Sequence, residues 1–287
     1  MLMVGAFVFA LAVVEIGLRL YLWQYIRTHV QPLHVPAEGG TLVYVLGDSI
    51  PAGYGLNQGE SWPSQLQTIL AARTNPPYSV YNAAEPGAGL IGLRNEQIGA
   101  VSQVAAGTPL VAIFEVGHND RTSLMFSGEA YEEDIGETGK IWGEMRIFRL
   151  FRSFQERRMR WRAPQQILEE GRERFARDIG ALCSVFTSRG GSCIFATYPV
   201  CGVIGQEQSS EYALAHNQTR AAQLTINQLI RWTGERLGVP ILDIADLVEL
   251  PMGWSEDDCL DAVHPTARVD RRIAEVVADA LVPEPVP

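Results

Sequence analysis

Residues 43–50 read Val-Tyr-Val-Leu-Gly-Asp-Ser-Ile: four apolar residues, a glycine that permits a sharp turn, and a serine just beyond it. An apolar run bounded by turn residues is typical of a strand that is covered on both faces. Such a strand would place Ser49 at the carboxyl edge of a sheet, where open α/β proteins bind ligands. The sequence therefore predicts a buried strand that delivers a serine able to act as a nucleophile, given a base and an oxyanion pocket.

Strand-like and helix-like segments alternate along the rest of the chain. The predicted strands are 41–46, 78–84, 109–116, 192–200 and 239–248. The predicted helices are 61–73, 90–105, 164–188, 210–237 and 266–281, the first opening with Ser61 as N-cap and Pro63 in its first turn. This alternation indicates right-handed crossovers and a parallel α/β sheet with both faces covered.

Each unusual polar motif follows a predicted strand: Ser49 the first, Gly87 the second, Asn119 the third, and Asp261 with His264 the fifth. A parallel sheet gathers these ends at one edge. Acyl transfer by a serine needs a base, an acid that orients the base, and oxyanion donors. His264 is the predicted base and Asp261 its orienting acid, while the backbone N–H groups of Ser49 and Gly87 and the Asn119 amide are the predicted donors. This chemistry requires no metal and no cofactor.

With these motifs the chain resembles the SGNH/GDSL hydrolase family over about residues 42–281. The matching blocks are Gly47-Asp48-Ser49, Gly87 after Asn82, Gly117-His118-Asn119-Asp120, and Asp261-Ala262-Val263-His264. In the second block, Gly89 is an alternative to Gly87. The resemblance implies a flavodoxin-like, three-layer α/β/α sandwich with a five-stranded, mainly parallel sheet. It also implies a serine esterase or acylhydrolase that works through a Ser-His-Asp triad and an acyl-enzyme.

Two other functions remain open. Some relatives use the same site for O-acetyl transfer to sugars, so an O-acetyltransferase acting on a cell-envelope or exported glycan is the alternative. A catalytically silent glycan-binding protein is a further possibility. The acyl group and the alcohol of the substrate are not evident from the sequence.

Composition limits the class of protein. The chain has 287 residues, 47% of them hydrophobic and 20% charged, which suits one α/β domain with an appendage. A net charge of −10 argues against nucleic acid as a partner. The four cysteines are too few and too irregularly spaced to predict a zinc ribbon or a disulfide scaffold, and they leave the redox compartment open.

The N-terminus predicts a single-pass membrane anchor at residues 1–28, followed by a linker at 29–40 and a catalytic domain at 41–283. Residues 1–14 are uncharged and almost wholly apolar, and a 26-residue helix is about 39 Å long, enough to cross a bilayer core. Glu15 and Arg19 are spaced to pair on one helix face. A cleaved signal peptide or a soluble amphipathic helix are the alternatives. The family resemblance favours an extracytoplasmic domain, whereas Arg19 and Arg27 point to the cytoplasmic side.

A predicted helical insert at 121–163 is the least family-like part of the chain. Its second half, residues 145–162, carries seven arginines against one glutamate, in a chain whose remainder is strongly acidic. Apolar residues recur there at helical spacing, so 146–162 is interpreted either as a cationic amphipathic helix that docks on membrane or as a packing helix paired with the acidic body.

Four further aspartates lie inside or near the motifs. Asp48 and Asp120 are interpreted as hydrogen-bond partners in tight turns and not as chemical participants. Asp257 and Asp258 precede the Asp-x-x-His block, but their spacing to His264 is less direct than that of Asp261.

Overall fold

A computed structural model describes residues 12–20, 39–75, 77–90, 93, 101–117, 164–199, 201, 210–252, 256–261 and 263–282. Five strands form one sheet in the order β2-β1-β3-β4-β5, and every neighbouring pair in it is parallel. Their bounds are β1 Thr41–Gly47, β2 Tyr78–Asn82, β3 Leu110–Glu115, β4 Ser192–Ala196 and β5 Ile241–Leu242. The predicted five-stranded parallel α/β sheet is confirmed. β1, the strand that precedes Ser49, lies inside the sheet between β2 and β3.

The two faces of β1 belong to two different cores. Leu42, Tyr44 and Leu46 are fully buried and face one core, whereas Val43 and Val45 are equally buried and face the other. Because side chains alternate along a strand, a run that is apolar throughout needs cover on both sides. The sequence pattern of β1 therefore specifies a layer on each face.

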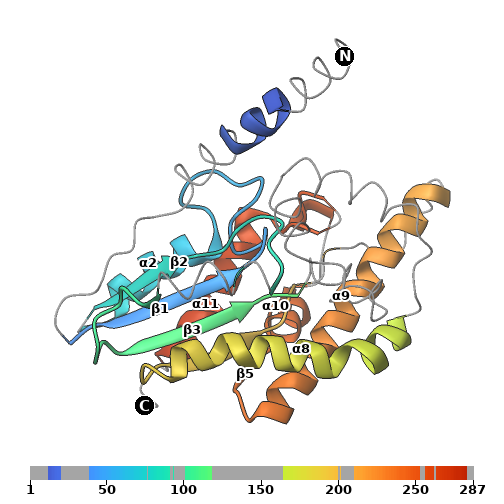
Figure 1. The fold of residues 1–287 in the computed structure, drawn as a ribbon. Helices are drawn as coiled ribbons and strands as arrows, with labels where there is room; N and C mark the ends of the chain where they lie inside the picture. Colours follow the sequence, from blue (N-terminus) through green and yellow to red (C-terminus); the bar gives the residue numbers. More distant parts are fainter. Residues whose placement is uncertain are drawn as a thin grey trace, which may run out of the picture.

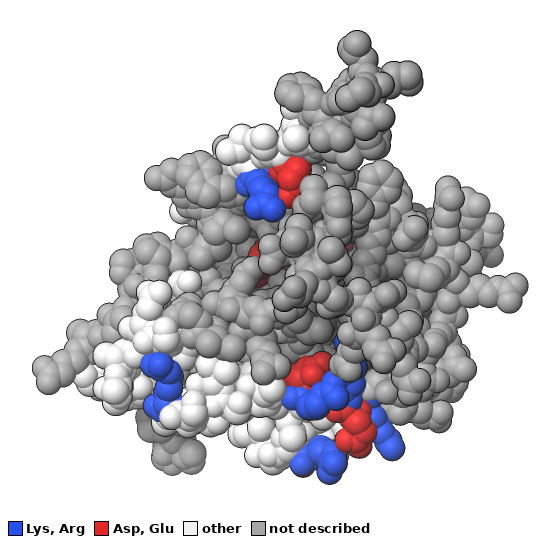
Figure 2. Space-filling view, viewed as in Figure 1, with Lys and Arg blue, Asp and Glu red and all other residues white. Residues whose placement is uncertain are grey.

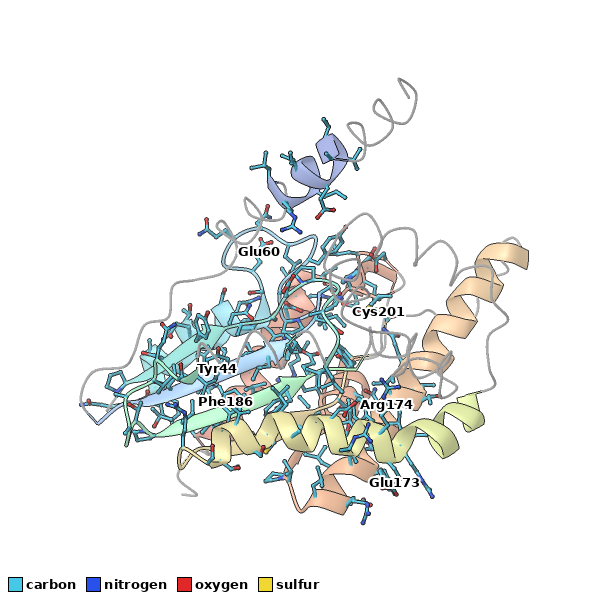
Figure 3. The ribbon with its side chains drawn as sticks, viewed as in Figure 1. Tyr44, Glu60, Glu173, Arg174, Phe186 and Cys201 are labelled. Carbon is cyan, nitrogen blue, oxygen red and sulfur yellow. A yellow bond between two sulfur atoms is a disulfide. The ribbon has the colours of Figure 1, made fainter. Side chains whose placement is uncertain are left out.

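Helices supply these layers (Figure 1). The helices are α2 Trp62–Arg73, α8 Pro164–Thr187, α9 Ser210–Leu237, α10 Ile244–Met252, the short 3₁₀ helix η1 Glu256–Asp258 and α11 Ala267–Leu281. α8 and α9 pack on the face of Tyr44, where the rings of Tyr44 and Phe186 meet edge to face at 5.2 Å (Figure 3). α2, α10 and α11 pack on the opposite face. The result is an α/β/α arrangement.

The fifth predicted strand is shorter than expected. The sequence predicts a strand over 239–248, but only Ile241–Leu242 pair with β4, and α10 begins at Ile244. Ile244 and Val248 are buried at helical spacing, so the same apolar residues serve one face of a helix. Between the two elements, Asp243 accepts hydrogen bonds from Arg231 and Thr197. Periodicity in a short apolar run could not distinguish these alternatives.

The start of α2 is capped differently from the prediction. Ser61 occupies the N-cap position, but its hydroxyl bonds to Ser64 instead of a backbone N–H of the first turn. The Trp62 N–H donates instead to Asp270 Oδ2, 2.8 Å away on α11. A carboxyl oxygen from a second helix thus replaces the local cap and joins α2 to α11.

Several predictions concern the N-terminus and the insert. Residues 12–20 are helical, and Glu15 and Arg19 form the expected ion pair at 2.7 Å. Within the described ranges no helix is long and apolar enough to cross a membrane. Most of the predicted anchor, the linker to residue 38, most of the predicted helix at 90–105 and the insert at 121–163 lie outside the described residues.

All four cysteines are paired, which the sequence did not indicate. Cys183 of α8 bonds to Cys193 of β4, and Cys201 bonds to Cys259 across 58 residues of chain. Cys201 lies on the side of the molecule toward which β1 and β3 point (Figure 3). The spacing is irregular because each bridge joins elements that meet only in the fold.

Candidate active site

The turn after β1 is shaped by close packing. A Cβ at Gly47 would overlap the Pro51 side chain and lie 2.8 Å from the Glu115 carbonyl, so no larger residue fits. Asp48 is 1% exposed and accepts hydrogen bonds from the Ile50 N–H at 3.3 Å and from the Tyr198 hydroxyl at 3.0 Å. These contacts match the interpretation of Asp48 as a hydrogen-bond partner within the turn. They hold the backbone on either side of Ser49.

Three of the predicted site residues form one chain of hydrogen bonds. Ser49 Oγ lies 2.9 Å from His264 Nε2. On the other side of the ring, His264 Nδ1 lies 2.7 Å from Asp261 Oδ2 and 3.0 Å from Asp261 Oδ1. The structure therefore brings the serine, the histidine and the aspartate together at the carboxyl edge of the sheet, in the order that a nucleophile, a base and an orienting acid require.

Asp261 is held as a carboxylate by its own loop. Burial by itself would raise the pKa of Asp261, but hydrogen bonds from the His264 ring and from the backbone N–H groups of His264 and Val263 lower it below its ordinary value. Both backbone N–H groups lie 2.8 Å from Oδ1. An ionised Asp261 can accept a hydrogen bond from the Nδ1–H of His264, which leaves Nε2 free to accept the Ser49 proton.

The loop that carries Asp261 and His264 is closed at its base. Cys259 and Pro265 form an antiparallel bridge, and the Leu260 N–H donates to the His264 carbonyl at 2.8 Å. Asp258, which is 3% exposed, forms an ion pair with Arg268 at the start of α11. The loop is thus fixed to α11 on one side and, through the Cys201–Cys259 disulfide, to the segment after β4 on the other.

Two predicted oxyanion donors lie in the described part of the chain. Gly87 has φ +78°, and its turn is joined to the end of β1 because the Glu85 N–H donates to the Gly47 carbonyl at 3.1 Å. Among the described residues, neither the Ser49 nor the Gly87 backbone N–H has a hydrogen-bond partner. Both remain available to an anion. Asn119, the third predicted donor, lies outside the described residues, as do His118 and Asp120.

Buried carboxyl groups that the sequence analysis did not single out lie beneath the site. Glu115 at the end of β3 is fully buried and accepts a hydrogen bond from Trp62 Nε1 at 2.7 Å. Burial raises the pKa of Glu115 well above its ordinary value; the nearby Asp48 and Asp270 raise it further, against the bond from Trp62. Burial likewise raises the pKa of Asp270. The sequence signal that could have identified Glu115 is its place as a single glutamate in an otherwise apolar strand.

Other described features lie away from the triad. A cavity of about 540 Å³ lies at the start of β3, between residues 104–110 and Ser188–Arg189, at the opposite edge of the sheet. Basic and acidic side chains lie side by side at the lower right of the surface in Figure 2. On α8, Arg174 forms an ion pair with Asp178. The described residues contain no cluster of His, Cys, Asp and Glu suited to a metal ion.

Comparisons with known proteins identify the family and the fold. The sequence profile of the GDSL-like Lipase/Acylhydrolase family matches residues 45–272. No curated protein sequence matches the chain. A lipolytic G-D-S-L family protein from Veillonella parvula has a similar structure at a TM-score of 0.52 and 13% identity, covering 86% of this chain and 100% of that one.

Two further solved structures share the fold. An aryl esterase from M. smegmatis has a TM-score of 0.52 and 11% identity, covering 84% of this chain and 98% of its own. A carbohydrate acetylesterase from Sinorhizobium meliloti has a TM-score of 0.51 with the same identity and coverages. At these identities the likeness concerns the fold, whereas the family match spans most of the chain and includes both ends of the triad. The chain belongs to the GDSL-like lipase/acylhydrolase family.

Proposed function

We propose that the protein is a serine ester hydrolase in which Ser49 is the nucleophile, His264 the base and Asp261 the orienting acid. The observation that carries this proposal is the continuous hydrogen-bond chain from Ser49 Oγ through His264 to Asp261. It lies at the carboxyl edge of a parallel sheet, where the backbone N–H groups of Ser49 and Gly87 have no hydrogen-bond partner among the described residues. Family membership supports ester hydrolysis in general.

The first half of the reaction follows from this geometry. His264 Nε2 takes the Ser49 hydroxyl proton as Oγ attacks the ester carbonyl, and the new imidazolium is stabilised by the ionised Asp261. The negative charge that develops on the carbonyl oxygen is received by the N–H groups of Ser49 and Gly87, together with the Asn119 amide. Each such donor is worth about 10²–10³ in rate. His264 then gives its proton to the departing alcohol, which leaves an acyl-enzyme on Ser49.

The second half uses the same groups on a different nucleophile. Water attacks the acyl-enzyme while His264 accepts its proton, and the collapse of the second tetrahedral intermediate returns Ser49 and releases the acid. If a sugar hydroxyl reaches the acyl-enzyme before water, the same residues perform O-acetyl transfer. A carbohydrate acetylesterase shares the fold, so acetylated sugars are included among the candidate substrates.

A two-part experiment tests this function. The purified protein is treated with a fluorophosphonate probe and assayed on short-chain aryl esters, with and without candidate glycans. We expect covalent labelling and release of free acid, both lost in Ser49→Ala. Labelling that is unchanged in Ser49→Ala would refute the assignment of the nucleophile, and acylated glycan as the main product would establish the transferase.

The two disulfides bear on location. Disulfides form and persist in oxidising compartments and are rare in reducing ones. We therefore propose that the catalytic domain works outside the cytoplasm, as the family resemblance also suggests, in spite of Arg19 and Arg27. The anchor at residues 1–28 stays a prediction, and protease protection of the domain in sealed membranes would determine both anchor and side.

Docking of the arginine-rich segment at 146–162 on a membrane also stays a proposal. If the anchor holds the domain close to a bilayer, each arginine near an anionic surface contributes about 1 kcal/mol, so three or four would suffice to dock the segment. Co-sedimentation of a chain starting near Thr41 with anionic liposomes at low salt tests this. Equal binding after Arg149 and Arg152 are changed to glutamine would indicate a packing role.

A further inference from the structure

An exposed tyrosine lies beside the base of the proposed triad, and an exposed leucine lies in the loop that carries this base. Tyr54 is 47% exposed, and its ring centre lies 4.9 Å from that of His264, with the planes tilted by 41°. Leu260 is also 47% exposed and lies four residues before His264 in the catalytic loop. A single exposed apolar residue is ordinary on a protein surface. Here Tyr54 lies against the His264 ring, and the Leu260 side chain approaches Gly55, the residue after Tyr54, so the two form one exposed apolar surface next to the site.

Hydrogen bonds fix the backbone of both residues. The Tyr54 N–H donates to the Ser49 carbonyl at 3.0 Å, and the Leu260 N–H donates to the His264 carbonyl at 2.8 Å. The two segments also touch, because a Cβ at Gly55 would lie only 3.0 Å from Leu260 Cδ1. Gly55 has φ +82°, a conformation that suits glycine. Tyr54 and Leu260 therefore form a wall, here called the Tyr54–Leu260 wall, whose two halves are each bonded to one member of the reactive pair.

The reaction determines which part of a substrate meets this wall. His264 must reach the oxygen of the departing alcohol to protonate it, so the alcohol lies against the imidazole. The carbonyl oxygen points the other way, toward the N–H groups of Ser49 and Gly87. A ring placed against His264 and extending over Tyr54 would cover the apolar surface that is otherwise exposed to water. An alcohol with a flat apolar face gains most from such a contact.

We propose that the Tyr54–Leu260 wall receives the alcohol portion of the ester and favours ring alcohols with a flat apolar face over small alkyl alcohols. This inference rests on the proposed ester hydrolysis. It assigns selectivity for the alcohol to residues outside the triad. The acyl group of the ester would bind on the other side of Ser49.

The test compares three esters by acid release: phenyl acetate, methyl acetate with the same acyl group, and phenyl butyrate with the same alcohol. Because the intrinsic reactivity of each ester cancels in a variant-to-wild-type ratio of kcat/KM, that ratio is the quantity compared. For Tyr54→Ala and Leu260→Ala we expect the ratio to fall about 3- to 10-fold further for phenyl acetate than for methyl acetate. Phenyl butyrate should fall as phenyl acetate does, and Tyr54→Phe should keep the wild-type preference.

Two controls separate the possible failures. Leu247→Ala removes an equally exposed leucine, 47%, from α10, outside the site, and should leave every ratio near one. Fluorophosphonate labelling of Leu247→Ala should match the wild type, since this change lies outside the site and leaves the triad intact. Equal losses on phenyl and methyl acetate, or losses that differ between phenyl acetate and phenyl butyrate, would overturn the wall while leaving ester hydrolysis standing. If the wild-type protein is not labelled by the fluorophosphonate and hydrolyses none of the three esters, both the wall and the proposed ester hydrolysis are overturned.

Discussion

Removal of the Cys201–Cys259 disulfide should weaken the fold and the site together. In the chain-entropy description of a crosslink, closing a loop of 58 residues stabilises the folded state by about 4 kcal/mol at 25 °C. The same relation gives about 2.7 kcal/mol for the loop of 10 residues between Cys183 and Cys193. The two disulfides can therefore be compared within one molecule, because their removal is expected to lower the free energy of unfolding by different amounts.

Their distances from the site also differ. Cys259 lies two residues before Asp261, at the base of the loop that carries the proposed acid and base, whereas Cys183 and Cys193 join α8 to the start of β4. Displacement of a catalytic group by about 1 Å can cost about 10²-fold in rate. We expect Cys201→Ala/Cys259→Ala to lose up to about 10²-fold in kcat/KM while still folded, and Cys183→Ala/Cys193→Ala to keep its activity.

The assay combines urea unfolding followed by tryptophan fluorescence with initial rates on an aryl ester, below the onset of unfolding. Two results would refute the reasoning. Full activity in folded Cys201→Ala/Cys259→Ala would show that the bridge does not position the loop. A smaller loss of stability for that pair than for Cys183→Ala/Cys193→Ala would contradict the dependence on loop length.

Three further predictions follow from single residues. Asp261→Asn should lower kcat by about 10²–10⁴-fold, since the carboxylate that orients the imidazole is lost, and near-normal kcat in this variant would exclude the role. In the folded protein the pKa of Glu115 is raised, whereas in the unfolded chain a glutamate ionises at about pH 4.3. The contribution of this group to the free energy of unfolding is therefore full below about pH 4.3 and declines as the pH rises toward the folded pKa. Glu115→Gln should therefore show a flatter dependence of unfolding free energy on pH above about 4.3, and urea titrations at several pH values that give parallel curves for both proteins would contradict it. Gly47→Ala should cost about 1–3 kcal/mol through its clash with Pro51, and an unchanged urea midpoint would disprove that contact.

Patterns within single elements made most of the fold predictable. The apolar run of β1 required cover on both faces, and the alternation of strands and helices required parallel pairing. The prediction was wrong at β5, because Ile244 and Val248 satisfy a helix as well as a strand. A short apolar segment does not carry enough periods to separate the two.

In the site, a local sequence motif was enough to predict contacts between residues of the same loop. Asp261 and His264 are three positions apart and meet within one turn, and Ser49 follows a recognisable strand. Contacts between distant segments could not be predicted in this way. The capping of Trp62 by Asp270 and the support of Asp48 by Tyr198 both join side chains that no local pattern connects.

The distance along the chain between the two reactive residues affects when the site can exist. Ser49 and His264 are 215 positions apart, and Trp62 and Asp270 are 208 apart. At typical synthesis speeds, roughly 10 to 40 s separate the appearance of the serine from that of its base on the ribosome. During that time β1 and Ser49 have been made, but His264, the proposed base, has not. Because such long-range pairings also form late in folding, the proposed nucleophile gains its base only when the loop before α11 docks, and the proposed activity is absent from the nascent chain.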